Sequence, residues 1–382
     1  MAGTARREGD LRNYVLVTAA YWADTLADGA SRILVLFFFY QLGYSALEVA
    51  TLFLFYEFFG IVTNLVGGWI ASRLGLKATL FSGLTIQIVA LGMLGFAPDE
   101  WLVVPYVMVS QALSGIAKDL TKMSSKSAVK LVVPEDSESS LFKWVAILTG
   151  SKNALKGVGF FLGGLLLTLI GFQASMLVLL GIVATALITT ASMMRGSLGY
   201  ADMGAKFRHM FSNTREINVL AAARLFLFAS RDVWFVVALP VYLRTVLDWS
   251  FWQAGGFLAI WVIGYGIVQA SAPGMFARRS AETGATPTGR SAAKLAFLLA
   301  AFPAAIAASL AANLDPTLVL VTGLILFGIV FALNSAVHSY LVLSYTDDES
   351  VSKNVVFYYM ANAGCRLIGT ILSGAVYQWL GL

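Results

Sequence analysis

Three charged residues interrupt an apolar run near the start of the chain, and their spacing could support ion binding or proton exchange. Asp24, Asp28 and Arg32 lie four residues apart in YWADTLADGASRILVLFFFY, residues 21–40. On a helix this spacing places all three on one face, with an acid one turn before a base, the favourable order for an ion pair. Each ionised side chain near the centre of a bilayer costs roughly 2.5 to 3.5 kcal/mol. This face is therefore expected to meet water, partners or a ligand rather than lipid.

More cations lie within other apolar segments. Lys152 and Lys156 are four residues apart, and like charges at this spacing repel each other unless an anion or a carboxylate lies between them. Arg224 and Arg231 share one helix face, and Arg366 interrupts the last segment. Arginine can bind two oxygens of a phosphate group, whereas lysine acts as a mobile point charge. The predicted substrate-binding residues are Arg32, Lys152, Asn153, Lys156, Arg224, Arg231 and Arg366.

Acidic residues in the same segments could carry protons or balance these cations. The candidates are Asp24, Asp28, Glu57 and Asp232. Arg32 could pair with Asp28 instead of a ligand. Arg231 could likewise pair with Asp232 or Asp24. Glu57 is either a proton carrier or a neutral, hydrogen-bonded helix contact.

Two further features have competing interpretations. Lysines recur at every fourth position at Lys118, Lys122, Lys126 and Lys130. This stripe indicates either membrane topology and contact with anionic lipid or, at Lys118 and Lys122, an electrostatic funnel. His338 could be packed or bonded to water, or it could relay protons.

Composition places the chain among polytopic membrane proteins. It is 58% hydrophobic and 12% charged, with a mean hydropathy of +0.78. The net charge of +5 is spread between hydrophobic segments and forms no basic face, which argues against nucleic acid as a partner. The single cysteine, Cys365, excludes an internal disulfide and a multi-thiolate metal site. No nucleophile motif, metal-ligand cluster or phosphate loop accompanies the charges, so we expect no enzymatic activity, no metal and no cofactor.

Eleven apolar segments are long enough to cross a membrane. They fall at residues 14–42, 46–71, 77–97, 101–125, 143–169, 173–195, 217–243, 251–276, 292–312, 317–343 and 354–380. Cations such as Arg73 and Lys77 lie between alternate segments, and acids such as Asp99 and Asp315 lie in the opposite loops. Because positive loops favour the cytoplasmic side, the N-terminus is predicted to be cytoplasmic.

The chain divides into two predicted halves. Residues 1–195 hold six spans, residues 196–216 form a central cytoplasmic linker, and residues 217–382 hold five spans. Shifting the second half back by about 205 to 213 residues aligns Gly328 with Gly115 and places Arg366 level with Asn153. A duplicated bundle predicts a binding site at the interface of the halves near the membrane midplane. The same symmetry predicts a twelfth span, which is missing before the last residue.

This organisation resembles the major facilitator superfamily. The stretch GWIASRLGLK, residues 68–77, is similar to that family's loop Gly-x-Leu-Ala-Asp-Arg-x-Gly-Arg-Lys, with Ser72 in place of the aspartate. The resemblance implies two six-helix repeats and a conformational-switch loop, formed here by Gly68, Arg73, Gly75 and Lys77. Residues 159–164, GFFLGG, are similar to the antiporter pattern Gly-Pro-x-x-Gly-Gly, although such spacing is also typical of helix-packing seams.

A narrower resemblance is to the ArsJ-type organoarsenical efflux permeases. It is carried by YEFFGIVTNLVGG, residues 56–68, and QALSGIAKDLTK, residues 111–122. It implies export of 1-arseno-3-phosphoglycerate, which forms when glyceraldehyde-3-phosphate dehydrogenase uses arsenate in place of phosphate, and hence a functional link to that enzyme. The positions of Arg32 and Arg231 also resemble those of organophosphate antiporters, which clamp phosphate between one arginine from each half.

Together these patterns predict an all-α polytopic membrane protein of major facilitator fold, acting as a monomer in a bacterial inner membrane. We expect a secondary exporter that moves an anionic organoarsenical by proton-coupled alternating access and so confers arsenate resistance. One alternative is an organophosphate:phosphate antiporter or uptake carrier. Another, of a different class, is a membrane anion sensor that binds its ligand without transport.

Overall fold

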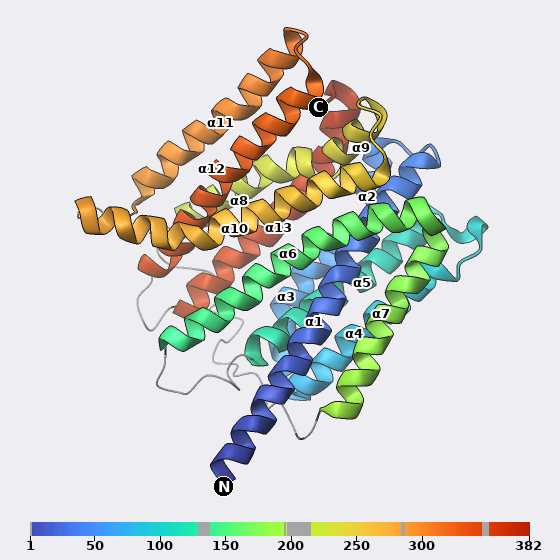
Figure 1. Cartoon of the computed structure of the whole chain (residues 1–382), viewed down its shortest axis with the longest axis vertical. Helices are drawn as coiled ribbons and strands as arrows, with labels where there is room; N and C mark the ends of the chain where they lie inside the picture. The colour runs from blue at the N-terminus through green and yellow to red at the C-terminus, as the bar shows by residue number, and fades with distance from the viewer. Residues whose placement is uncertain (1, 129–137, 195, 197–214, 284–286, 346–350) are drawn as a thin grey trace.

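The chain folds into helices throughout the residues that the structure describes. The computed structural model describes residues 2–128, 138–194, 196, 215–283, 287–345 and 351–382. In chain order (Figure 1) the elements are α1 (Ala2–Gln41), α2 (Ala46–Leu52), α3 (Leu54–Leu74), α4 (Leu76–Gly95), the short 3-10 helix η1 (Asp99–Trp101), α5 (Val104–Ala128), α6 (Glu138–Ile170), α7 (Phe172–Met193), α8 (Arg215–Phe235), α9 (Ala238–Thr245), α10 (Phe251–Thr283), α11 (Gly289–Ala311), α12 (Pro316–Ser344) and α13 (Val351–Leu380). Each predicted segment coincides with one long helix or with two consecutive helices, so the all-α prediction is confirmed.

The break between α8 and α9 follows from a proline. Pro240 has no N–H group with which to continue the helical hydrogen bonds, and the helix is interrupted just before it. The hydroxyl oxygen of Ser373, on α13, accepts hydrogen bonds from the N–H groups of Val237 (3.0 Å) and Ala238 (3.1 Å). Because the bilayer core offers no water to such groups, this contact anchors α13 to the break.

Local sequence also sets the ends of several helices. Gly75 separates α3 from α4 with φ of +82°, a conformation that glycine adopts readily. Ser45 and Glu48 form a reciprocal capping box at the start of α2. Asp315 accepts a hydrogen bond of 2.7 Å from the N–H of Leu318 in the first turn of α12. The short connections between spans therefore rest on residues close to them in the sequence.

Glycines bring the central helices close together. Gly159 and Gly163 of α6 face the backbone of α1 at Leu26 and Ala30, and Gly164 faces the backbone of α10. A Cβ atom at any of these three positions would overlap a carbonyl oxygen of the neighbouring helix. These are the glycines of the GFFLGG pattern, and here they form helix contacts. As a result α6 lies between α1 and α10 (Figure 1).

The last helix, α13, packs against both the second half of the bundle and its beginning. Its main neighbour is α8, and it also contacts α2 and α3. The backbone of α13 at Gly374 lies directly against Ala46 and Leu47, and the side-chain oxygen of Gln378 accepts a hydrogen bond from the N–H of Leu47 (3.1 Å). Residues of α13 are thereby placed beside residues of α3.

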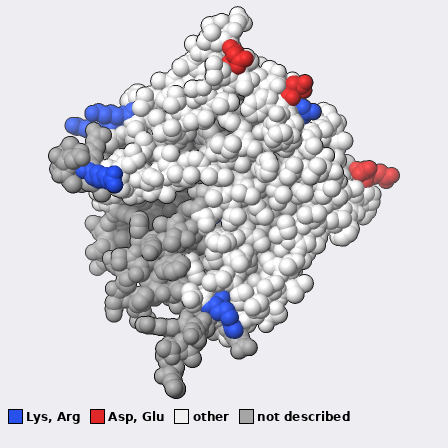
Figure 2. Space-filling model, in the orientation of Figure 1, with Lys and Arg blue, Asp and Glu red and all other residues white. Residues whose placement is uncertain are grey.

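The surface agrees with a membrane location. Within the described chain, eight helices are long and apolar enough to cross a membrane. Figure 2 shows one face on which charged side chains lie near the margins, while its described centre is uncharged. The protein is a multi-pass membrane protein.

The proposed halves meet along α6 and α10 and where α13 contacts α2 and α3. Most of the predicted linker, residues 196–216, lies outside the described residues. The division at residues 195 and 217 therefore stays a prediction.

Candidate anion-binding site

Glu57 lies between two arginines that are far apart in the sequence. Its Oε1 atom accepts hydrogen bonds from Nη1 of Arg32 on α1 (2.9 Å) and from Nη2 of Arg366 on α13 (2.8 Å). The Glu57 side chain is 4% exposed, whereas those of Arg32 and Arg366 are 10% and 26% exposed. Two cations thus share one carboxylate oxygen, and this cluster of three residues carries a net positive charge.

Aromatic residues of α3 and the turn before it hold the cluster in place. The Arg32 guanidinium carbon lies 5.0 Å from the ring centroid of Phe53 and 4.6 Å from that of Tyr56, within the range of cation–π attraction. The Tyr56 hydroxyl donates a hydrogen bond to Oδ1 of Asp28 (2.6 Å). Gly115 of α5 sits against the Tyr56 carbonyl, which allows α5 to approach α3 closely. Asp28 is therefore bonded to Tyr56, and within the described chain no ion pair closer than 4.0 Å joins it to Arg32.

Asp24 is the most isolated acid of this region. Its Oδ2 atom accepts a hydrogen bond from the Thr121 hydroxyl on α5 (2.6 Å), and the residue is 1% exposed. Its Oδ1 atom has no hydrogen-bond partner, and no cation lies within 4.0 Å, among the residues that the structure describes. Burying a charge without a partner is costly. Asp24 thus differs from Glu57, whose charge is compensated by two arginines, and it stays the candidate proton carrier.

The first two lysines of the predicted stripe pair with an acid between them. Lys122 Nζ lies 2.8 Å from Oδ1 of Asp119 and 2.9 Å from Oδ1 of Asn64 on α3. Lys118 Nζ is 3.9 Å from Oδ2 of Asp119 and 4.0 Å from the ring centroid of Tyr56. These lysines therefore face helix α3 and the arginine cluster. The Lys126 side chain and the whole of Lys130 lie outside the described residues.

A second cationic cluster lies on α8. Arg231 bonds through Nε to Oδ1 of Asp232 (2.7 Å), which is one of the two internal pairings predicted for it. Its guanidinium carbon is 5.1 Å from the ring centroid of Phe228, and that of Arg224 is 3.8 Å from the same ring. Arg224 also donates hydrogen bonds to Ser335 on α12. The guanidinium groups of α8 are therefore held by aromatic and polar neighbours.

The predicted residues of α6 lie beside the first cluster. Lys152, Asn153 and Lys156 are all partly buried. The Nζ atom of Lys156 is 5.6 Å from the ring centroid of Phe160, and in the described chain no carboxylate lies within 4.0 Å of it. The backbone of Lys156 lies against Gly29 of α1, three residues before Arg32. Lys156 therefore belongs to the part of α6 that packs against α1.

The cluster of Arg32, Glu57 and Arg366 thus forms a cationic site between helices from both ends of the chain. A family model described as Major Facilitator Superfamily matches residues 17–381. The chain belongs to the major facilitator superfamily. As a member of that superfamily it is a membrane transporter. No curated protein matches the chain.

Solved structures of other transporters share this superfamily fold. The nucleoside transporter NupG, in the form of a point mutant, matches with a TM-score of 0.72 and 14% identity, covering 96% of this chain and 92% of that one. A POT family transporter in complex with 5-aminolevulinic acid matches with a TM-score of 0.74 and 14% identity, covering 97% and 91%. A bacterial homologue of the iron transporter ferroportin, in an inward-facing state, matches with a TM-score of 0.70 and 13% identity, covering 97% and 94%. At these identities the likeness shows the fold alone.

The predicted switch loop of this superfamily member joins α3 to α4. Gly75 forms the turn, and Lys77 Nζ donates hydrogen bonds to the carbonyls of Met194 (3.4 Å) and Gly196 (3.5 Å) after α7. Arg73 is exposed. Gly68 lies on α3, and its surroundings are outside the described residues. The loop is thus tied to the end of α7, and its switching role stays a prediction.

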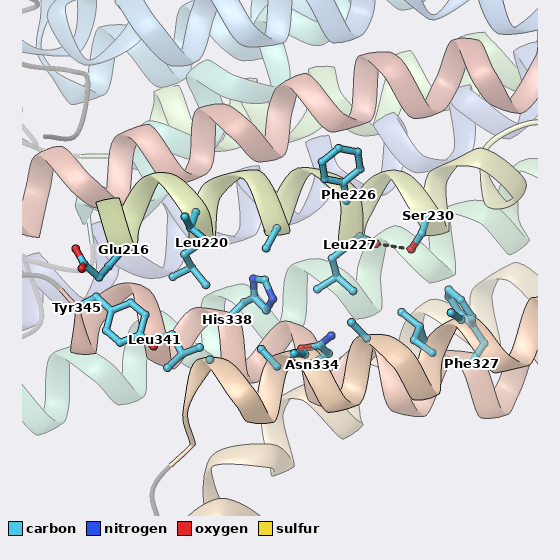
Figure 3. A pocket seen from close by; sticks show the side chains of 18 of the residues that line it. Glu216, Leu220, Phe226, Leu227, Ser230, Phe327, Asn334, His338, Leu341 and Tyr345 are labelled. Carbon is cyan, nitrogen blue, oxygen red and sulfur yellow. Dashed lines mark hydrogen bonds between the residues drawn. The ribbon is translucent and has the colours of Figure 1, made fainter. Parts of the chain in front are cut away.

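The structure also contains a cavity of about 770 Å³ between α8, α11 and α12. Asn334 and His338 project from α12 into it (Figure 3). Both are buried, and in the described chain neither polar atom of the Asn334 amide has a hydrogen-bond partner, nor has Nδ1 of His338. When the two predicted halves are aligned, α8 and α11 correspond to α1 and α4. In the first half α7 packs against α1 and α4, so the cavity lies at the position that corresponds to α7.

Sequence reasoning found Arg32, Glu57, Lys156 and Arg366 but missed Tyr56 and Asp119 as site residues. Tyr56 directly precedes Glu57, and an acid between two lysines at Lys118 and Lys122 is a signal for an ion pair. Both residues could therefore have been identified from their neighbours. The structure brings Arg32 to Arg366 through Glu57, while Arg231 on α8 is paired with Asp232.

Proposed function

We propose that the protein exports a small organic anion with several negative charges, 1-arseno-3-phosphoglycerate, by alternating access. The observation that carries this proposal is the pair of arginines, Arg32 and Arg366, held on one carboxylate oxygen, with Lys156 on the helix that packs against Gly29 of α1. An anionic ligand with a phosphate at one end and an acyl arsenate at the other suits guanidinium groups, which bind such oxygens in pairs.

The two stretches that resemble the ArsJ-type permeases contribute residues to the surroundings of the arginine pair. Residues 56–68 supply Tyr56 and Glu57, and residues 111–122 supply the lysines and Asp119 that face them. The specific likeness therefore includes Tyr56, Glu57 and Asp119, which contact the cations of the proposed site. This coincidence supports the substrate class that the resemblance implies.

The lone cysteine fits an arsenate ester better than trivalent arsenic. Cys365 is the single thiol of the chain, and it is buried. Chelation of trivalent arsenic requires several thiols, whereas an arsenate ester requires cations. The cations of the site meet the second requirement.

Proton exchange is the proposed energy source. Asp24 supports it because its carboxyl is buried beside the site without a cation within 4.0 Å in the described chain. We further propose a monomer in the bacterial inner membrane, with its N-terminus in the cytoplasm and with substrate supplied by glyceraldehyde-3-phosphate dehydrogenase acting on arsenate.

The test is transport into everted vesicles of enzymatically generated 1-arseno-3-phosphoglycerate, beside 3-phosphoglycerate and inorganic phosphate. We expect uptake of the organoarsenical that depends on the pH gradient and is lost in Arg32→Ala and Arg366→Ala at unchanged membrane content. Arsenate resistance of cells that express either variant at the wild-type level would refute anion binding by this pair of arginines. Counterflow driven by loaded phosphate would instead support an organophosphate antiporter, and binding without flux would support a sensor.

A further inference from the structure

The Glu57 carboxylate occupies the position that an anionic group of a ligand would take between Arg32 and Arg366. A single oxygen accepts a hydrogen bond from each guanidinium, at 2.9 Å and 2.8 Å. Such charge-assisted hydrogen bonds are the geometry by which arginines bind carboxylate, phosphate or arsenate oxygens. Without this carboxylate, two guanidinium groups would face each other across a buried site with no anion between them.

Burial differs among the three residues in a way that suits exchange of the partner anion. Glu57 is almost fully buried, and it directly follows Tyr56, whose carbonyl is in close contact with Gly115 of α5. The Arg366 side chain is 26% exposed, the largest exposed fraction of the three. Arg366 is thus the member of the cluster that a ligand oxygen could approach while Glu57 keeps Arg32.

The same hydrogen bond connects two parts of the bundle. Glu57 belongs to α3, near the start of the chain, and Arg366 belongs to α13, its last helix. At one end of these helices α13 is packed against α2 through Gly374. The Glu57–Arg366 bond is a polar link between α3 and α13, and it breaks if Arg366 turns to another anion.

We propose that Glu57 is a built-in counter-anion, which takes the place of the substrate anion in the empty carrier and yields Arg366 to the substrate on binding. This role rests on the proposed transport of an anion. It allows the empty carrier to bring its two arginines together without repulsion, and it makes substrate binding compete with the α3–α13 link. Glu57 is thus a positioning and gating residue.

One variant, Glu57→Gln, should affect binding and turnover in opposite directions. Glu57→Gln keeps a hydrogen-bond acceptor but removes the charge, so the competing anion disappears. We expect the purified variant to bind 3-phosphoglycerate at least roughly tenfold more tightly, since a hydrogen bond to a charged group is worth more than that factor. In vesicles, exchange of labelled for unlabelled 3-phosphoglycerate should persist while net efflux is lost, because the empty carrier can no longer neutralise its arginines.

The controls distinguish this role from a structural one. Glu100→Gln makes the same chemical change at an exposed position and should leave affinity and flux unchanged. Glu57→Asp keeps the charge with a shorter reach and should give an intermediate affinity, and it serves as the second variant should Glu57→Gln fold poorly. Unchanged or weaker binding by a folded Glu57→Gln protein, or equal loss of exchange and net efflux, overturns the proposal. If the wild type binds none of the anions, the proposed function itself is refuted.

Discussion

Replacing Arg366 by alanine should weaken anion binding strongly while destabilising the fold only moderately. The side chain contributes one charge-assisted hydrogen bond of 2.8 Å to Glu57. A hydrogen bond to a charged group is worth about 1.5 to 3 kcal/mol. Glu57 keeps its bond to Arg32, so no buried charge is orphaned. Because the Arg366 side chain is 26% exposed, we expect the lower end, a loss of about 1.5 kcal/mol in the free energy of unfolding.

Arg32→Ala provides the contrast. The Arg32 side chain is 10% exposed and lies over the rings of Phe53 and Tyr56 as well as bonding Glu57. Glu57 keeps its bond to Arg366 in this variant, so the cost is the lost charge-assisted hydrogen bond, about 1.5 to 3 kcal/mol and nearer the upper end at this more buried position, together with the lost cation–π contacts. Arg32→Ala should therefore lower the free energy of unfolding more than Arg366→Ala does. Both variants should lose affinity for 3-phosphoglycerate.

The assay is equilibrium unfolding in mixed micelles, combined with titration calorimetry of the same preparations. Arg290→Ala, which removes an exposed arginine of α11, is the matched control and should stay within about 0.5 kcal/mol of the wild type. A double variant with Glu57→Gln measures the coupling between the two side chains. If Arg366→Ala destabilised the protein as much as Arg32→Ala, or if it kept full affinity for the anion, the charge cluster would not work as described.

Three further predictions concern other parts of the bundle. Gly164→Ala should lower the free energy of unfolding by about 1 to 3 kcal/mol, because its Cβ atom would overlap the Phe251 carbonyl, whereas Gly181→Ala, with open space around it, should not; thermal unfolding in detergent compares the two. Asp24→Asn should keep uptake at equal pH on both sides but abolish its stimulation by a pH gradient in vesicles, and a gradient response as large as that of the wild type would exclude Asp24 as the proton carrier. Asn334→Leu should raise the free energy of unfolding by about 1 kcal/mol, since it removes buried polar atoms that lack partners in the described chain, and a fall would indicate a polar group bound in the cavity.

The general architecture could be predicted from the sequence because a membrane span is a local property. About 20 consecutive apolar residues suffice to cross a bilayer, whatever the neighbouring helices do. Each of the eleven predicted segments coincides with helix in the structure; most boundaries are displaced by a few residues, but α1 begins at Ala2 rather than at residue 14 and α10 continues to Thr283 rather than to residue 276. The polar surroundings of the charges within these segments could also be predicted, because any ionisable group in an apolar run requires a polar environment.

The partners of those charges could not be predicted in the same way. Asp28 and Arg32 are correctly spaced for a pair on one helix, but Asp28 bonds Tyr56 and Arg32 bonds Glu57. In contrast, the pairing of Arg231 with its neighbour Asp232 was among the predicted alternatives. Contacts between adjacent residues follow from the chain, whereas contacts between helices depend on how each helix is rotated and how deeply it sits.

The contact between Arg366 and Glu57 shows most clearly what could not be predicted from the sequence. The two residues are 309 positions apart, and no spacing rule connects them. Their contact exists because α13 is packed against α2 and α3 and because Gly115 and Gly374 allow backbones to approach closely. Sequence alone determined that the bundle has charged residues in its interior and where along the chain they lie. Only the tertiary structure decided which of them meet, since a rotation of one helix by a single residue, about 100°, would turn each side chain toward a different neighbour.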